Sequence, residues 1–136
     1  MKSLKINIYM KTSLIITFFS IFWSCNIGES KFVIKQIDNK DITIKWYYYS
    51  YISNFSPDFV VVEKDGLKRE IYKATDVILN VSLNDHNIIL KLVKPSKGLV
   101  FTKKVDKEVF GYKITLDTTG TYDELKLRPD GVKEDN

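Results

Sequence analysis

The chain has 136 residues, of which 44% are hydrophobic and 13% aromatic, enough apolar material for the core of one folded domain. Its formal net charge is +4, but Lys2, Lys5 and Lys11 precede residue 25 in a stretch without Asp or Glu. Removing these three from the 21 basic residues leaves 18 against 17 acidic ones, or +1. The composition argues against extensive disorder, and it leaves nucleic-acid binding without electrostatic support.

The first 24 residues have the pattern of a signal peptide. A basic start is followed by an apolar run at 12–23, which is too short for the roughly 20 residues of a membrane-spanning helix. Ser24 and then Cys25, the only cysteine of the protein, come directly after this run. Because Met10 also opens a compact signal of this kind, translation could start at Met1 or at Met10.

A small residue and a cysteine at the end of a short apolar run resemble the lipobox of bacterial lipoproteins, in a loose form similar to that of Bacteroidetes. Phe22 and Trp23 depart from the usual residues of that motif. The resemblance covers about the first 25 to 30 residues. It implies that residues 1–24 are removed and that Cys25 carries lipid. The protein would then be anchored in the cell envelope, with its domain on the periplasmic or surface-exposed face. The sequence does not specify whether the anchor lies in the inner or the outer membrane. The alternative is a buried free cysteine after an uncleaved anchor.

After a short tether at 25–31, runs of β-branched and aromatic residues alternate with turn-forming residues. These runs predict strands at 32–37, 42–51, 59–63, 68–72, 76–83, 88–93, 99–102 and 110–116. Turns are predicted at 38–41, 64–66 and 84–87. Outside the signal segment, no adequate window has apolar residues at helical spacing.

We therefore predict an all-β fold, preceded by an N-terminal signal helix. The β-domain at 32–117 is expected to be an antiparallel β-sandwich or small barrel of about seven to eight short strands. A polar C-terminal tail at 118–136 is expected to follow, and to fray from residue 132.

Alternation along the strands predicts which side chains enter the core. The strand at 59–63 is apolar on both faces and is expected inside a sheet, whereas the polar strand at 68–72 is expected at an edge. The predicted core residues are Ile42, Ile44, Trp46, Tyr48, Ile52, Val77, Leu79, Val81, Leu83, Ile88, Leu90, Leu92, Phe110, Tyr112, Ile114 and Leu116.

The opposite face of the strand at 42–51 carries Tyr47, Tyr49 and Tyr51. Tyrosine favours strands and packs across them, so these rings could serve cross-strand packing alone. The alternative to this favoured interpretation is a possible binding surface for an envelope protein or a glycan. We expect an open aromatic groove if the ligand is a glycan, a flat apolar patch if it is a protein, and two facing carboxylates in a cleft if the protein is an enzyme.

A second surface feature is a basic run. Six lysines lie within 17 residues, and only Asp106 opposes them. They are Lys91, Lys94, Lys97, Lys103, Lys104 and Lys107. Such a run is usually a solvated face, and the alternative is contact with anionic headgroups or glycans.

The sequence offers little for catalysis. His86 is the only histidine, whereas a catalytic zinc site wants about three protein ligands. Phosphate-binding glycine loops, zinc knuckles and nucleophile elbows are absent, and the scattered carboxylates leave only a carboxylate-based hydrolase open. We predict a non-catalytic, lipid-anchored envelope protein that is a binding or structural module and uses neither cofactor nor metal. The alternative is a lipoprotein inhibitor or accessory subunit of an envelope enzyme or complex.

Overall fold

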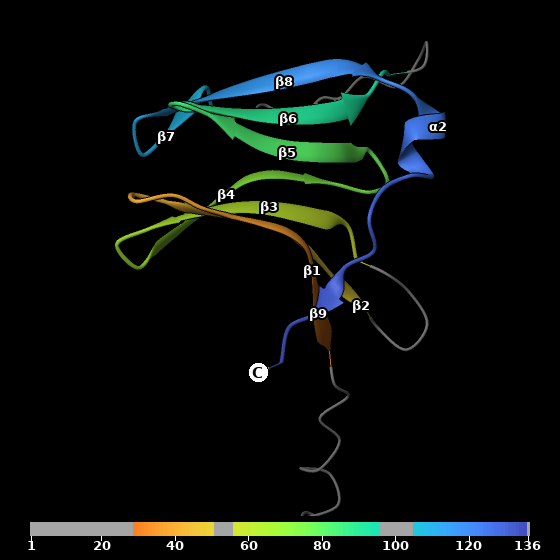
Figure 1. Cartoon of the computed structure of the whole chain (residues 1–136), viewed down its shortest axis with the longest axis horizontal. Helices are drawn as coiled ribbons and strands as arrows, with labels where there is room; N and C mark the ends of the chain where they lie inside the picture. The colour runs from red at the N-terminus through yellow and green to blue at the C-terminus, as the bar shows by residue number, and fades with distance from the viewer. Residues whose placement is uncertain (1–28, 51–55, 96–104, 136) are drawn as a thin grey trace, which may run out of the picture.

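The computed structural model describes residues 29–50, 56–95 and 105–135. Within them, two β-sheets face each other, as Figure 1 shows. One sheet has the strand order β4-β3-β2-β1-β9 and the other the order β5-β6-β8-β7. The strands are β1 (Ser30–Asp38), β2 (Thr43–Ser50), β3 (Asp58–Lys64), β4 (Leu67–Ala74), β5 (Ile78–Asn84), β6 (Asn87–Val93), β7 (Glu108–Val109), β8 (Tyr112–Gly120) and β9 (Val132–Lys133). The single described helix, α2, is the short segment Tyr122–Leu125. The predicted all-β fold class is confirmed, and the arrangement is that of a sandwich.

Tight turns connect the hairpins where the sequence predicted them. Asp65 and Gly66, with φ of 50° and 78°, join β3 to β4 in the left-handed conformation that such two-residue turns require. As predicted, β3 lies inside its sheet and β4 at the edge. The predicted strand at 99–102 lies outside the described residues.

One strand pair departs from the predicted antiparallel arrangement. β6 and β8 are parallel, with Asn87 opposite Lys113. The reason is β7, which turns back into β8 through Phe110 and Gly111, both at positive φ. Because of this tight turn, β6 and β8 start from the same side of the sheet and run in the same direction.

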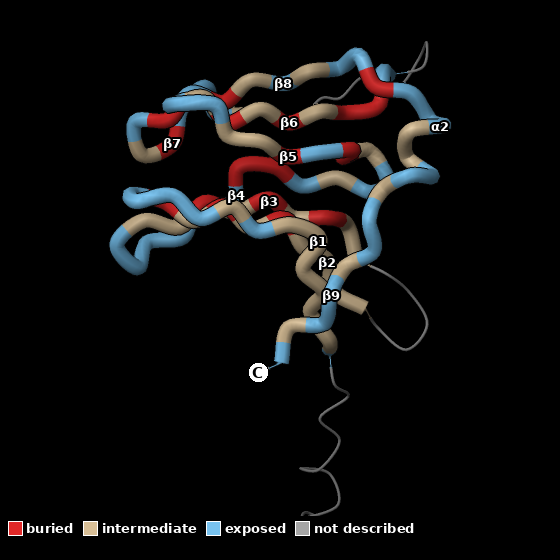
Figure 2. Tube along the Cα trace, viewed as in Figure 1, coloured by how far each residue is buried: buried red, intermediate tan, exposed pale blue. Residues whose placement is uncertain are grey.

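The core lies between the two sheets, where the buried stretches of the facing strands meet (Figure 2). Of the predicted core residues, Ile42, Ile44, Trp46, Leu79, Val81, Ile88, Leu90, Leu92, Tyr112 and Ile114 are buried. Tyr48, Val77, Leu83 and Phe110 are half-buried, and Ile52 lies outside the described residues.

One core residue was not predicted, and one core prediction is wrong. On β5 the register shifts between Ile78 and Asn80, so Ile78 joins Val81 in the core cluster, and the predicted Leu79 is buried against Gly120. On β8, Leu116 is 39% exposed. The two-residue β7 pairs with β8 only at Tyr112 and Lys113, so it leaves the flank of Leu116 open.

The C-terminal segment, which was predicted to be a polar tail that frays, returns to the sandwich. A capping box starts α2, because Thr121 accepts from the Glu124 amide while the Glu124 carboxylate accepts from the Thr121 amide. The chain then reaches β1, where β9 pairs Val132 with Val33. In the part of the chain that the structure describes, no helix is long and apolar enough to cross a membrane.

Candidate functional site

The predicted tyrosine surface lies on the face of β2 opposite the buried Trp46, and thus on the side of the five-stranded sheet that faces away from the four-stranded sheet, called here the outer face. Tyr47 and Tyr49 are on this face and half-buried, whereas Tyr51 lies outside the described residues. The strand register places Phe59 opposite Tyr47, and Lys73 opposite Phe59. Three neighbouring strands therefore bring one side chain each into a single row.

Two lysines and two aromatic rings in this region form a layer across the sheet. The rings of Tyr47 and Phe59 stack with centroids 5.5 Å apart. Lys31 Nζ lies 4.3 Å from the Tyr47 centroid, and Lys73 Nζ lies 4.9 Å from the Phe59 centroid. Tyr49 meets both rings edge-on. Neighbours on the same sheet thus contact the ring faces, so the packing interpretation applies to Tyr47. We call Lys31, Tyr47, Phe59 and Lys73 the lysine-aromatic layer.

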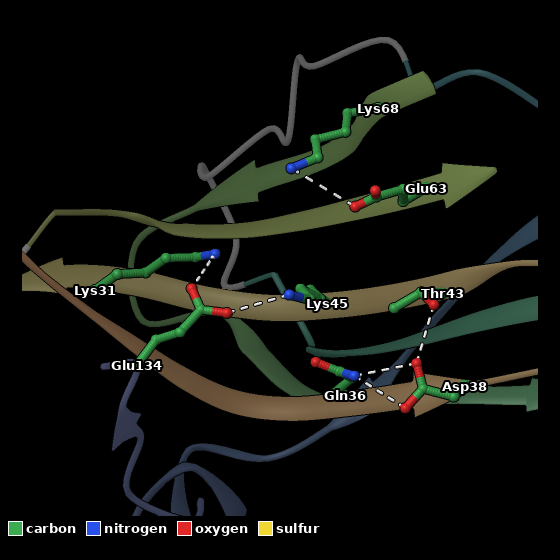
Figure 3. A network of polar contacts seen from close by, with 8 residues as sticks. All are labelled: Lys31, Gln36, Asp38, Thr43, Lys45, Glu63, Lys68 and Glu134. Carbon is green, nitrogen blue, oxygen red and sulfur yellow. Dashed lines mark hydrogen bonds and ion pairs between the residues drawn. The ribbon is translucent and has the colours of Figure 1, made fainter. Parts of the chain in front are cut away.

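Glu134 connects the lysines beside this layer. It pairs with Lys31 at 2.6 Å and with Lys45 at 3.1 Å (Figure 3). The hydrogen bond from Lys31, followed by the one from Lys45, holds the pKa of Glu134 below its ordinary value. Burial raises the pKa of Tyr47 to about 12, and a side-chain hydrogen bond with Tyr49 adds to this rise, so its phenol is neutral.

The rest of the outer face is polar. Lys68 pairs with Glu63 at 3.6 Å, and Asp38 accepts hydrogen bonds from Gln36 and Thr43 (Figure 3). The hollow beside Tyr47 holds only about 50 Å³. Four lysines there face four carboxylates, so the face favours neither sign of charge. The lysines are Lys31, Lys45, Lys68 and Lys73, and the carboxylates are Asp38, Glu63, Glu70 and Glu134.

The structure also contains a concave site that the sequence did not predict. This end pocket has a volume of about 470 Å³ and lies where the ends of β2 and β3 meet the connections after β4 and after α2. Its described lining residues are Tyr48, Ser56, Asp58, Thr75, Asp76, Arg128 and Asp130.

A buried ion pair forms one wall of the end pocket. The side chain of Asp58 is only 5% exposed, and its Oδ2 pairs with Arg128 Nη1 at 2.6 Å. The same oxygen accepts a hydrogen bond from Trp46 Nε1 at 3.2 Å. Burial raises the pKa of Asp58, and the charge of Asp76 adds to this rise, whereas Arg128 and Trp46 oppose it.

The other sequence candidates remain apart from both sites. His86 is exposed and stacks on Tyr112, with ring centroids 5.1 Å apart. Within the described ranges, no three His, Cys, Asp or Glu residues are grouped to hold a metal ion. Of the basic run, Lys91 pairs with Glu124 and Lys94 and Lys107 are exposed. Lys97, Lys103 and Lys104 lie outside the described residues, as does Cys25.

Comparison of the chain with protein-family models, with curated proteins and with solved structures finds no match. Its function therefore has to be inferred from its own residues.

Proposed function

We propose that this chain is a lipid-anchored protein of the bacterial cell envelope whose β-sandwich is a non-catalytic binding module. The observation that carries this proposal is the lysine-aromatic layer. Its side chains are held by contacts on a rigid sheet, so little conformational entropy is lost when a partner binds there. The anchor is inferred from the lipobox pattern that ends at Cys25.

A protein partner fits the outer face better than a glycan does. A sugar ring would need an open ring face to stack on, but Tyr47 and Phe59 stack on each other and lie under Lys31 and Lys73. The hollow beside Tyr47 holds only about 50 Å³, and aromatic side chains lie there among balanced charges, as in the core and rim of many protein interfaces. If the partner is a protein, the chain would act as an accessory or inhibitory subunit of an envelope complex. A glycan remains the alternative ligand.

The anchor is tested by the substitution Cys25→Ser. Each buried CH₂ of an acyl chain contributes about 0.8 kcal/mol, so several chains would hold the protein on the membrane. We expect the wild type in the membrane fraction with a lipid mass on Cys25, and the variant released or mislocalised. An unmodified Cys25 in the native protein, found by mass spectrometry, would exclude the anchor.

The binding face is tested by photo-crosslinking in cells. A photoreactive amino acid at Tyr49 or at Lys73 should give the same discrete protein adduct, because Lys73 belongs to the lysine-aromatic layer and Tyr49 borders it. The matched control is Lys113, an exposed strand position of the four-stranded sheet. Equal labelling from all three positions, or none, would contradict the proposal. A polysaccharide adduct would favour the glycan alternative.

A further inference from the structure

The end pocket is a recess of the size of a ligand site, with two fixed walls. Its volume of about 470 Å³ lies within the usual range of about 300 to 1,000 Å³ for small-molecule sites. The Tyr48 ring that lines it is fixed, because it stacks on Phe32 with centroids 5.3 Å apart. Asp58 and Arg128 are fixed by their ion pair and by Trp46 behind them. Two of the walls are therefore formed before any ligand arrives.

Two carboxylates of the end pocket, those of Asp76 and Asp130, have no partner among the described residues. Asp58 is neutralised by Arg128, and Ser56 Oγ is occupied by the Tyr49 amide and the Pro57 carbonyl. Among the described residues, Asp76 and Asp130 have neither a hydrogen bond nor an ion pair, although both line the pocket. With all three carboxylates ionised against one guanidinium, the described lining residues carry a formal charge of −2.

We propose that the end pocket binds a small hydroxylated amine, of which an amino sugar is the simplest form. The ammonium group would meet Asp76 and Asp130, which can only accept hydrogen bonds when ionised. The hydroxyl groups of the ligand would meet Thr75 and the edge of the Arg128 guanidinium.

Other ligand classes fit this lining less well. An anion would face two uncompensated carboxylates, while Arg128 is already paired. An apolar ligand would cover the carboxylates of Asp76 and Asp130 without giving them a hydrogen-bond partner. The described part of the chain holds no cluster of ligands suited to a metal ion. The end pocket is separate from the lysine-aromatic layer, so this inference does not depend on the proposed partner of the outer face.

The test uses three related probes with the full chain purified in a mild detergent. They are glucosamine, which is cationic, glucose, which is neutral, and glucose 6-phosphate, which is anionic. Isothermal titration calorimetry should give binding in the order glucosamine, glucose, glucose 6-phosphate. Glucosamine that binds no more tightly than glucose would overturn the proposal, as would the absence of binding by any probe at high millimolar concentration.

The site is located by a pair of variants. Asp76→Asn combined with Asp130→Asn keeps the shape of the pocket and removes both uncommitted charges, so it should weaken glucosamine binding by roughly tenfold or more. The matched control, Asp85→Asn, changes an exposed aspartate in the turn between β5 and β6 and should leave the affinity unchanged. Thermal unfolding of each variant checks that the fold is retained. Unchanged affinity in the doubly substituted protein, or an equal loss in the control, would overturn the assignment.

Discussion

Replacing Arg128 with Met should strongly destabilise the protein, because the Asp58 carboxylate would stay buried without its counter-charge. Removing one partner of a buried ion pair costs about 3 to 5 kcal/mol. The side chain of Asp58 is 5% exposed and that of Arg128 is 20% exposed, so water screens part of the interaction. We therefore expect a loss at the lower end, about 3 kcal/mol. Met retains an apolar side chain of similar length near the Trp46 ring. The loss of stability should therefore reflect the missing charge of Arg128 and not lost packing.

The same C-terminal segment supplies a matched control. Lys126 pairs with Asp123 at 3.0 Å, but these side chains are 77% and 91% exposed. Because exposed pairs contribute about 0 to 1 kcal/mol, Lys126→Met should change the free energy of unfolding by less than about 1 kcal/mol. A further variant, Asp58→Asn with Arg128→Met, should recover much of the lost stability. Asn removes the buried charge and keeps an oxygen acceptor for Trp46 Nε1.

The stability that Arg128→Met loses should also depend on pH. Burial raises the pKa of Asp58 in the folded state, and removing Arg128, which opposes this rise, raises the pKa further. A raised folded pKa means that the native state binds the proton more tightly, so stability falls as the pH rises from the unfolded pKa through the folded one. The Arg128→Met loss should be largest at neutral pH. It should shrink as the pH falls through the raised folded pKa of Asp58, because the carboxyl group then becomes protonated and needs no counter-charge.

Urea unfolding followed by circular dichroism, at neutral and at acidic pH, measures these differences. The reasoning would be refuted if Arg128→Met and Lys126→Met lost the same amount, or if the Arg128→Met loss did not change with pH.

Three other predictions concern stability. Trp46→Ala should cost about 3 to 5 kcal/mol, because the ring is almost fully buried between the sheets, and a loss below about 1 kcal/mol in urea would contradict its place in the core. Glu134→Gln should flatten the acid side of the stability curve. The lowered pKa of Glu134 gives stability that is present above the unfolded pKa and lost as the pH falls through the folded one, so parallel curves for the two proteins would refute this. Gly131→Ala should lower the melting temperature, at a cost of about 1 to 3 kcal/mol, because an added Cβ would lie 2.9 Å from the Phe32 Cβ; an unchanged melting temperature would show that the neighbours yield freely.

The alternation of apolar residues predicted most of the core. Ile44 and Trp46 on β2, like Ile88 and Leu90 on β6, are buried as expected. The same rule missed Ile78 on β5, because a register shift places this residue in the core cluster. A bulge of this kind depends on the partner strand, and the residues of β5 alone do not reveal it.

The candidate sites were predictable only in part, for a similar reason. Alternation placed Tyr47 and Tyr49 on one face, but the contacts of Phe59 and Lys31 with Tyr47 depend on neighbouring strands. The end pocket was not predictable. Arg128 and its partner on β3 lie 70 positions apart, and the segment that carries Arg128 has no apolar pattern that would place it against the sandwich.

The polar C-terminal segment determines the geometry of both candidate sites. It passes from the four-stranded sheet along the side of the sandwich to β1 (Figure 1), and it is held at three points by Glu124, Arg128 and Glu134. Arg128 forms a wall of the end pocket, and Glu134 fixes the position of Lys31 over the Tyr47 ring. Partly exposed ion pairs such as those of Glu124 and Glu134 add little stability, so their main effect is to orient side chains. The charged residues of this segment predicted a free tail, but they are the groups that attach it to the sandwich. Its composition therefore could not distinguish a free tail from a segment bound along the sandwich.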